Sequence, residues 1–404
     1  MKNIIVGQSG GPTAVINASL AGVFAEADRR GAESIYGMRH GIQGFLEEKI
    51  IDMREYVKNS LDVEILKRTP SSFLGSCRYK LPKVEDNEQV YQNIFAILKK
   101  LEIDGFFYIG GNDSMDTIMK LSLYGEKIGS HIRFIGIPKT VDNDLAVIDH
   151  SPGFASAAKY IATTIKEAVL DAHVYPGSDL TIVEIMGRNT GWLTAAASLA
   201  RGEDSLGVDA IYLPEATFDI DGFLETAAKI SKDRPAVIAI SEGIKLADGR
   251  YVQDLSGEER STDSFGHKQL SGSANYLSTL AAHKLGKKCR SIVLSILQRS
   301  AAHIASAVDV SEAFALGRAG VDAAIGGENG KVMITTRISN NPYASKIEPI
   351  EINKIANIEK LVPKEWIKDV YVTQEYIDYA LPLIQGEVSP YFVNGTPRHL
   401  TLKR

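Results

Sequence analysis

The chain has 404 residues, of which 44% are hydrophobic, and it carries a formal net charge of −5. This length predicts two to three domains with sizeable cores, and the negative charge argues against a nucleic-acid-binding surface. The only cysteines, Cys77 and Cys289, exclude a disulfide framework and a four-cysteine metal site. Since we find neither a targeting sequence nor a membrane-spanning run, we expect a cytoplasmic protein with no membrane partner.

The first predicted strand, residues 2–6, leads into the glycine-rich turn Gly7-Gln8-Ser9-Gly10-Gly11-Pro12. A helix follows, because apolar residues recur at spacings of three and four over residues 16–27. Backbone N–H groups and the positive end of a helix suit an anion, so this arrangement predicts a phosphate site. The turn lacks both the G-x-G-x-x-G pattern and a P-loop Lys-Ser/Thr, so tight packing is an equally good interpretation.

The next predicted elements are a strand at residues 34–38, a helix at 88–101 and a strand at 104–109. Between them lies a polar loop, residues 71–78, that carries Arg78. The strand at 104–109 runs into Gly110-Gly111-Asn112-Asp113-Ser114, just before another helix. A second polar, glycine-rich turn is therefore predicted at the carboxyl end of a strand.

The strand at residues 132–137 ends in the most polar loop, Pro138-Lys139-Thr140-Val141-Asp142-Asn143-Asp144. Burying this cluster without a ligand would be costly. At the carboxyl end of a parallel strand it predicts a catalytic loop, in which Asp142 takes a proton, Asp144 holds a hard cation and Lys139 neutralises phosphate. The alternative is a turn in which Asp and Asn bond their own backbone. With Asp113 nearby, a divalent metal and a phosphate could share one site.

Further strands are predicted at residues 180–186, 209–213, 236–240, 291–297 and 331–335, alternating with helices. Residues 246–269 are polar and glycine-rich and predict a surface excursion before a helix at 270–285; the tail holds a candidate helix at 374–384. This alternation predicts an α/β fold: two Rossmann-like, three-layer α/β/α domains with mostly parallel sheets and the active site in the cleft between them.

With these loops in this order, the chain resembles the phosphofructokinase family from Gly10 to about Lys331. The loop 138–144 and the stretch 110–114 are the specific parts, and Met186-Gly187-Arg188 supports them. The family has ATP-using and pyrophosphate-using members, and Asp113 and Lys139 match the second type, where ATP users carry small residues. A carboxylate at 113 would repel a nucleotide α-phosphate, and Lys139 would supply charge to pyrophosphate. Ile42 stands where bacterial ATP enzymes stack adenine on a tyrosine.

The resemblance implies reversible phosphoryl transfer from pyrophosphate to the 1-hydroxyl of fructose 6-phosphate, with Mg²⁺, by a homodimer or homotetramer. It implies a donor domain of residues 1–155, completed by about 298–350, and a sugar-phosphate domain of 156–297, completed by the tail 351–404. Alternatives are an ATP-dependent enzyme, an enzyme for another sugar phosphate such as sedoheptulose 7-phosphate, and a non-catalytic regulatory subunit. Intact Asp142, Thr140 and Lys139 argue against the last.

Residue roles follow from the resemblance position by position. Catalysis falls to Asp142, Thr140 and Lys139; pyrophosphate binding to Gly11, Arg78, Asp113 and Lys139; metal binding to Asp113 and Asp144; and sugar-phosphate binding to Thr140, Asp142, Met186, Gly187, Arg188, Glu242, Arg290 and Arg299. Three positions depart from the family pattern: Asn112 replaces an acidic metal neighbour, Ile296 a sugar contact, and Asp179 an Arg that reaches the neighbouring subunit.

Overall fold

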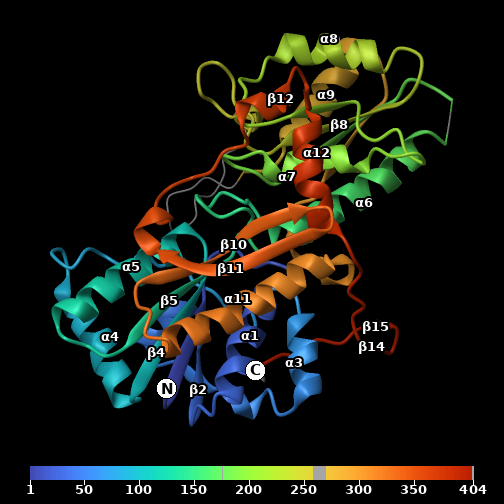
Figure 1. Ribbon diagram of the computed structural model, residues 1–404. Coiled ribbons are helices and arrows are strands. Elements are labelled where there is room, and N and C mark those ends of the chain that lie inside the picture. The colour runs from blue at the N-terminus through green and yellow to red at the C-terminus, as the bar shows by residue number, and fades with distance from the viewer. Residues whose placement is uncertain (175, 258–269, 403–404) are drawn as a thin grey trace.

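The computed structural model describes residues 1–174, 176–257 and 270–402 and shows two α/β regions, one above the other in Figure 1. The first region is built on a seven-stranded sheet with the order β11-β10-β5-β4-β1-β2-β3. Its strands are β1 (Asn3–Gln8), β2 (Ser34–Met38), β3 (Ile50–Asp52), β4 (Ile103–Gly110), β5 (Arg133–Pro138), β10 (Lys331–Asn340) and β11 (Tyr343–Glu351). All neighbours pair in parallel except the edge strands β3 and β11, which are antiparallel.

Helices cover both faces of this sheet because its central strands are apolar on both sides. One face packs against α1 (Ile16–Arg29), α3 (Ser60–Lys67) and α11 (Ala307–Ile325). The other packs against α2 (Gly41–Leu46), α4 (Glu88–Lys100) and α5 (Asn112–Lys127). A Cβ on Gly22 of α1 would lie 2.1 Å from the carbonyl oxygen of Phe314 in α11, so only glycine lets these two helices pack this closely.

The second region is built on a four-stranded, fully parallel sheet with the order β7-β8-β6-β9. Its strands are β6 (Leu180–Ile185), β7 (Ala210–Tyr212), β8 (Ala236–Ser241) and β9 (Cys289–Val293). On one face lie α6 (Phe154–Ala172), α7 (Trp192–Ala195) and α12 (Gln374–Ala380), and on the other α8 (Ile220–Ile230) and α9 (Ser273–Leu285). The predicted α/β fold with two three-layer, mostly parallel domains is confirmed.

The tail contacts both regions. Its residues Val362, Val372, Tyr376 and Leu383 join the core of the second region, whereas Leu400 and Leu402 pack against the first. It also contains two small hairpins, β12 (Ile367–Lys368) with β13 (Tyr371–Val372) and β14 (Phe392–Val393) with β15 (Thr396–Pro397). The donor and sugar roles of the two domains stay predictions.

Two predictions from the sequence need correction. The strand expected at residues 291–297 is β9, which ends at Val293, because Ser295 takes a left-handed backbone (φ 45°) and the short helix α10 (Leu297–Ser300) follows. The surface excursion expected at residues 246–269 is partly inside, since Val252 is fully buried against the second sheet; residues 258–269 lie outside the described chain. No helix among the described residues is long and apolar enough to cross a membrane.

Candidate active site

The loop after β5 is held by backbone hydrogen bonds at its start. The N–H of Lys139 donates to the carbonyl of Gly110 at 2.9 Å, which joins this loop to the end of β4. The N–H of Asp142 donates to Oγ1 of Thr140 at 3.1 Å. Asn143 has a left-handed backbone (φ 54°), a conformation that Asn tolerates better than most residues. The polar side chains of the loop therefore follow a tight turn at the carboxyl ends of β4 and β5.

Lys139 is buried, with 2% of its surface exposed, and its Nζ donates to the carbonyl of Gly11 at 2.6 Å. Gly10 has φ 76°, a backbone conformation that favours glycine, and a Cβ there would lie 3.3 Å from the same Nζ, so glycine also leaves room for the ammonium group. Burial lowers the pKa of Lys139 to about 8, although Asp142 opposes the shift. A buried cation beside a phosphate-type turn would regain its full charge when an anion binds.

Asp142 and Asp144 are half-buried, and the pKa values of both carboxyls are shifted towards the neutral form. Burial raises the pKa of Asp142, and Lys139 and then Arg299 oppose this. Burial, together with the charge of Asp142, raises the pKa of Asp144 to about 7. A carboxyl with a raised pKa in such a position suits proton transfer or cation binding.

The second sheet brings its own loops to the same place. The N–H of Gly187 faces Oε1 of Glu242 at 3.4 Å, and burial raises the pKa of Glu242 to about 8. Gly187 has φ 148°, and a Cβ there would lie 2.5 Å from the carbonyl oxygen of Thr190. Arg188 interacts electrostatically with both Asp142 and Glu242. Oγ1 of Thr190 donates to the carbonyl of Asp142 at 3.0 Å, which ties the two regions together.

Arg299, on α10, completes the site between the regions. A Cβ on Gly11 would lie 3.1 Å from Nη1 of Arg299, so the guanidinium reaches the first glycine-rich turn. Burial, and then the charge of Arg78, lower the pKa of Arg299, while Asp142 and Glu242 oppose them. Met186 is half-buried, and its N–H donates to Oε1 of the buried Gln298 at 3.2 Å. The predicted residues brought together are Gly11, Arg78, Lys139, Thr140, Asp142, Asp144, Gly187, Arg188, Glu242 and Arg299.

Arg290 is not brought to this site within the chain. It lies on β9 beside Thr181, at the opposite end of the second sheet from Met186, and its Nη1 is 3.6 Å from the carboxylate of Asp171. Its role in sugar-phosphate binding stays a prediction. Asp113 is exposed as the second residue of α5, and Ile42 is fully buried in the first core, where it offers no face to an adenine ring.

One observation supports a hard cation, such as Mg²⁺, near the residues that were expected to bind it. Oδ1 of Asn112, next to Asp113, is buried and accepts no hydrogen bond from any described residue. An amide carbonyl oxygen is a ligand that Mg²⁺ accepts, and the ion keeps several waters and takes few protein ligands. Accordingly, no group of three or more carboxylates, histidines or cysteines suited to a metal occurs in the described part of the chain.

The structure also places tail residues at the site that the sequence did not indicate. Glu359 interacts electrostatically with Asp142 and Asp144, and its Oε1 accepts from Nδ2 of Asn189 at 3.1 Å. The N–H of Lys360 donates to the carbonyl of Asp144 at 2.7 Å. These contacts span at least 170 residues of sequence and belong to no local motif, so no pattern in the tail could have identified them.

Comparison with known proteins agrees with this geometry. The family model described as phosphofructokinase matches residues 3–324. Two relatives named pyrophosphate–fructose 6-phosphate 1-phosphotransferase, from Xanthomonas campestris and Methylococcus capsulatus, are each 40% identical over 99% of this chain and 96% of their own length. The crystal structure of a pyrophosphate-dependent phosphofructokinase from Nitrosospira multiformis is 36% identical and superimposes with a TM-score of 0.88, covering 100% of this chain and 96% of that one. As its loops predict, the chain belongs to the phosphofructokinase family.

Proposed function

We propose that this enzyme transfers a phosphoryl group from pyrophosphate to the 1-hydroxyl of fructose 6-phosphate and gives fructose 1,6-bisphosphate and phosphate. The observation that carries the proposal is the buried ammonium of Lys139 on the carbonyl of Gly11, at the meeting point of two glycine-rich turns. A compact, highly charged anion would offset the cost of burying that cation. The names of the full-length relatives support the same donor and acceptor.

Three features favour pyrophosphate over ATP as the donor. Lys139 fills space beside Gly10 and Gly11, and Asp113 puts a carboxylate at the end of β4 that would repel an α-phosphate. Ile42 is inside the core and cannot stack on an adenine. Pyrophosphate, which has only two phosphates, is compatible with these three features. Each of them disfavours the binding of a nucleotide.

In the proposed mechanism, Asp142 accepts the proton of the sugar 1-hydroxyl. The resulting oxygen forms a bond to one phosphorus of pyrophosphate as the bridging oxygen–phosphorus bond breaks, and phosphate leaves. Lys139, Arg78, the Thr140 hydroxyl and the Gly11 amide stabilise the charge that develops on the phosphoryl oxygens. The raised pKa of Asp142 suits a base that must hold the proton it takes. Since phosphate is a poor energy sink, the reaction should run in both directions.

The sugar phosphate is proposed to bind to the loops of the second sheet. Arg188 and Arg299 hold its phosphate, because a guanidinium can donate two hydrogen bonds to one anion. Glu242, whose pKa of about 8 keeps it protonated at neutral pH, can donate a hydrogen bond to a sugar hydroxyl. Met186 and Gly187 are proposed to line the same binding site. Arg290 remains a candidate for sugar-phosphate binding, although its position on β9 lies away from this site within the chain.

Mg²⁺ is the proposed cofactor, with Asp113 and Asp144 as its carboxylate ligands and Asn112 beside them. When bound, it would neutralise charge on pyrophosphate and lower the barrier to phosphoryl transfer. We also propose that the first region, residues 1–155 with about 298–350, is the donor domain and the second the sugar-phosphate domain. A cytoplasmic homodimer or homotetramer is proposed as the working form.

The proposal is tested by offering the purified protein fructose 6-phosphate and Mg²⁺ with pyrophosphate or ATP in parallel, while fructose 1,6-bisphosphate is measured. We expect a higher kcat/KM with pyrophosphate and net reversal when phosphate and fructose 1,6-bisphosphate are supplied. A higher kcat/KM with ATP would overturn the donor assignment. Faster turnover of sedoheptulose 7-phosphate would overturn the acceptor, and no turnover with either donor would favour a regulatory subunit.

A further inference from the structure

Asn143 lies between Asp142 and Asp144, and its side chain fixes the middle of the catalytic loop. It is fully buried, and its Oδ1 accepts a hydrogen bond from the N–H of Ser151 at 2.9 Å. Its Nδ2 donates to the hydroxyl of Tyr379 at 2.8 Å. The two flanking carboxyls therefore take their direction from a residue whose side chain is held from two sides.

Tyr379 belongs to α12 in the tail, 236 residues after Asn143. Its hydroxyl donates to the carbonyl of Asp149 at 2.8 Å while it accepts from Asn143, so one oxygen joins two points of the loop. Its ring lies 5.3 Å from that of Trp192, between centroids, and the guanidinium of Arg337 lies 4.8 Å from the ring centroid. The hydroxyl is thus held in place by packing on a rigid core.

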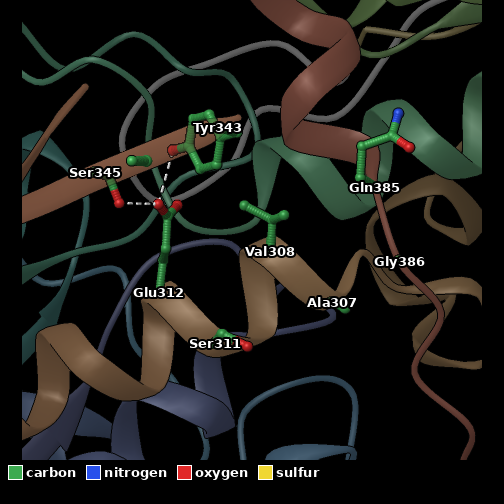
Figure 2. A pocket seen from close by; sticks show the side chains of 9 residues that line it. Ala307, Val308, Ser311, Glu312, Tyr343, Ser345, Gln385 and Gly386 are labelled. Atoms are coloured by element: carbon green, nitrogen blue, oxygen red, sulfur yellow. Dashed lines mark hydrogen bonds between the residues drawn. The ribbon is translucent and has the colours of Figure 1, made fainter. Parts of the chain in front are cut away.

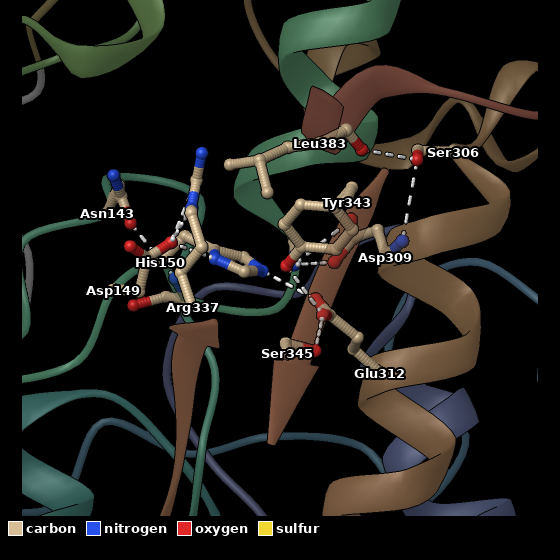
Figure 3. Close-up of polar contacts among 12 residues, drawn as sticks. Asn143, Asp149, His150, Ser306, Asp309, Glu312, Arg337, Tyr343, Ser345 and Leu383 are labelled. Carbon is tan, nitrogen blue, oxygen red and sulfur yellow. Dashed lines mark hydrogen bonds and ion pairs between the residues drawn. The ribbon is translucent and has the colours of Figure 1, made fainter. Parts of the chain in front are cut away.

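The far side of Asp149 is anchored as well, as Figure 3 shows. Its carboxylate accepts from Nη2 of Arg337 at 2.9 Å and lies 2.7 Å from Nδ1 of His150. Nη1 of Arg337 also donates to the carbonyl of Tyr379 at 2.9 Å. Asp149 is therefore held from several sides. The Tyr379 hydroxyl, which is hydrogen-bonded to both Asp149 and Asn143, connects this anchored residue to the catalytic loop.

A second tail residue holds the loop independently of Tyr379. Nζ of Lys360 donates to the carbonyls of Ile148 at 3.1 Å and Asp149 at 2.8 Å, and its backbone N–H holds the carbonyl of Asp144. Removal of the Tyr379 hydroxyl should therefore leave the loop folded but free to shift at Asn143.

We propose that Tyr379 is a positioning residue for phosphoryl transfer: its hydroxyl orients Asn143 and, through Asn143, the carboxyls of Asp142 and Asp144. This inference rests on the proposed function of Asp142 as the base. A base must be held within a fraction of an ångström of its productive position, and a displacement of about 1 Å can lower the rate about 100-fold. In this proposal Tyr379 acts through its two hydrogen bonds to the loop.

The test compares Tyr379→Phe with Tyr376→Phe, a matched control one turn earlier on α12. Tyr376 is fully buried and Tyr379 is partly buried, and both pack in the core of the second region. The hydroxyl of Tyr376 also donates to a carbonyl, at 2.6 Å, but that carbonyl belongs to Trp192 and not to the loop. Both variants lose one buried hydroxyl and should lose similar Tm. Only Tyr379→Phe should lower kcat, by about 10-fold to 100-fold, with smaller changes in both KM values. Asn143→Gly, which keeps the left-handed backbone and removes the other partner, should do the same.

Equal kcat in Tyr379→Phe and Tyr376→Phe, at similar Tm, would overturn the positioning role. If the parent protein prefers another donor, the proposed function fails in that respect, and the same pair of variants is compared with that donor. Amide hydrogen exchange over residues 140–152 gives a readout that needs no turnover. Exchange should quicken in Tyr379→Phe and not in Tyr376→Phe, and equal exchange in the two would contradict the proposal.

Discussion

Two partly buried groups of charged residues lie at opposite ends of the loop between β5 and α6, and the pKa values in one group shift towards the ionised forms while those in the other shift towards the neutral forms. We call Asp149, His150, Glu312 and Arg337 the anchoring cluster. Burial would lower the pKa of His150, but its hydrogen bonds to Asp149 at 2.7 Å and Glu312 at 2.5 Å raise it to about 9. Burial would raise the pKa values of Asp149 and Glu312, but the same hydrogen bonds lower them. The hydrogen bonds therefore hold Asp149, His150 and Glu312 in their ionised forms.

The site cluster of Lys139, Asp142 and Asp144 shows the reverse. Burial lowers the pKa of Lys139 to about 8 and raises that of Asp144 to about 7, and Asp142 is raised as well. These groups are near one another, yet each is shifted towards its neutral form. We infer that charges with close hydrogen-bond partners stabilise the fold. In the proposed function, the charges shifted towards their neutral forms bind substrate and metal.

The largest effect is expected for the base. Asp142→Asn keeps the shape of the side chain and removes the proton acceptor, so kcat should fall by about 10²–10⁴. Because burial disfavours the Asp142 carboxylate, Tm should stay the same or rise. Steady-state rates and thermal melts measure both quantities. A variant that keeps most of its kcat would exclude Asp142 as the base.

A smaller loss is expected for the sugar-phosphate arginines. Arg299→Ala removes a charge-assisted hydrogen bond of about 1.5–3 kcal/mol, which should raise the KM for fructose 6-phosphate more than that for pyrophosphate. Arg188→Ala should act alike. Arg290→Ala is compared with these variants, and its effect should be smaller if Arg290 acts only within its own chain, where it lies beside Asp171. A larger rise in the pyrophosphate KM would show that the two sides are reversed.

Substitution in the anchoring cluster should change the free energy of unfolding in a way that depends on pH. The charged form of His150 stabilises the fold fully below its unfolded pKa of about 6.5, and this contribution is lost as pH rises through about 9. His150→Gln should therefore be less stable than the parent at pH 6, by about 1–3 kcal/mol for unpaired buried partners, and the difference should shrink by pH 9.5. Glu312 also lines an open pocket of about 450 Å³ with Tyr343 and Ser345 (Figure 2). Urea unfolding at several pH values measures the difference, and a constant difference would contradict a charged His150.

The site cluster should show the opposite slope, and this is the smallest effect. Lys139 has a folded pKa of about 8, below its ordinary value of 10.5, so the unfolded chain binds more protons between these pH values. Stability of the parent relative to Lys139→Met should therefore increase as pH rises from about 8 to 10.5. The same urea series measures it. A decrease over that interval would mean that Lys139 is well paired without a ligand.

The sequence predicted the residues of the site loops better than the distant residues that hold those loops in place. The carboxyl ends of parallel strands lie at the same edge of a sheet. The sequence pattern alone could therefore predict that residues following strands lie close together, as Gly11, Lys139, Asp142 and Arg188 do. Arg299 also lies beside Gly11, although it stands on α10 and not at the end of the strand predicted for residues 291–297. The register of several motifs identified the family and the fold.

The distant residues that hold the loops could not be predicted, because their roles depend on tertiary contacts. Tyr379 and Lys360 lie in a tail with no motif, and each acts through a hydrogen bond to a loop more than 200 residues away. His150 reads as an ordinary histidine in sequence, and only its position between Asp149 and Glu312 gives it a role. Arg290 matches the family by position, but within this chain it pairs with Thr181, away from Met186, and its sugar-phosphate role stays a prediction.

The most direct test of the account is the donor preference of the parent, Asp113→Gly, Lys139→Gly and the double variant. Asp113 is proposed to exclude a nucleotide by charge, and Lys139 to attract pyrophosphate and to fill the path of a nucleotide. The measurement is the ratio of kcat/KM for ATP to that for pyrophosphate. It should rise in each single variant and rise in the double variant by more than the two changes combined, because residues in one site couple. A ratio in the double variant equal to that of the parent would contradict the claim that these two residues form a pyrophosphate site.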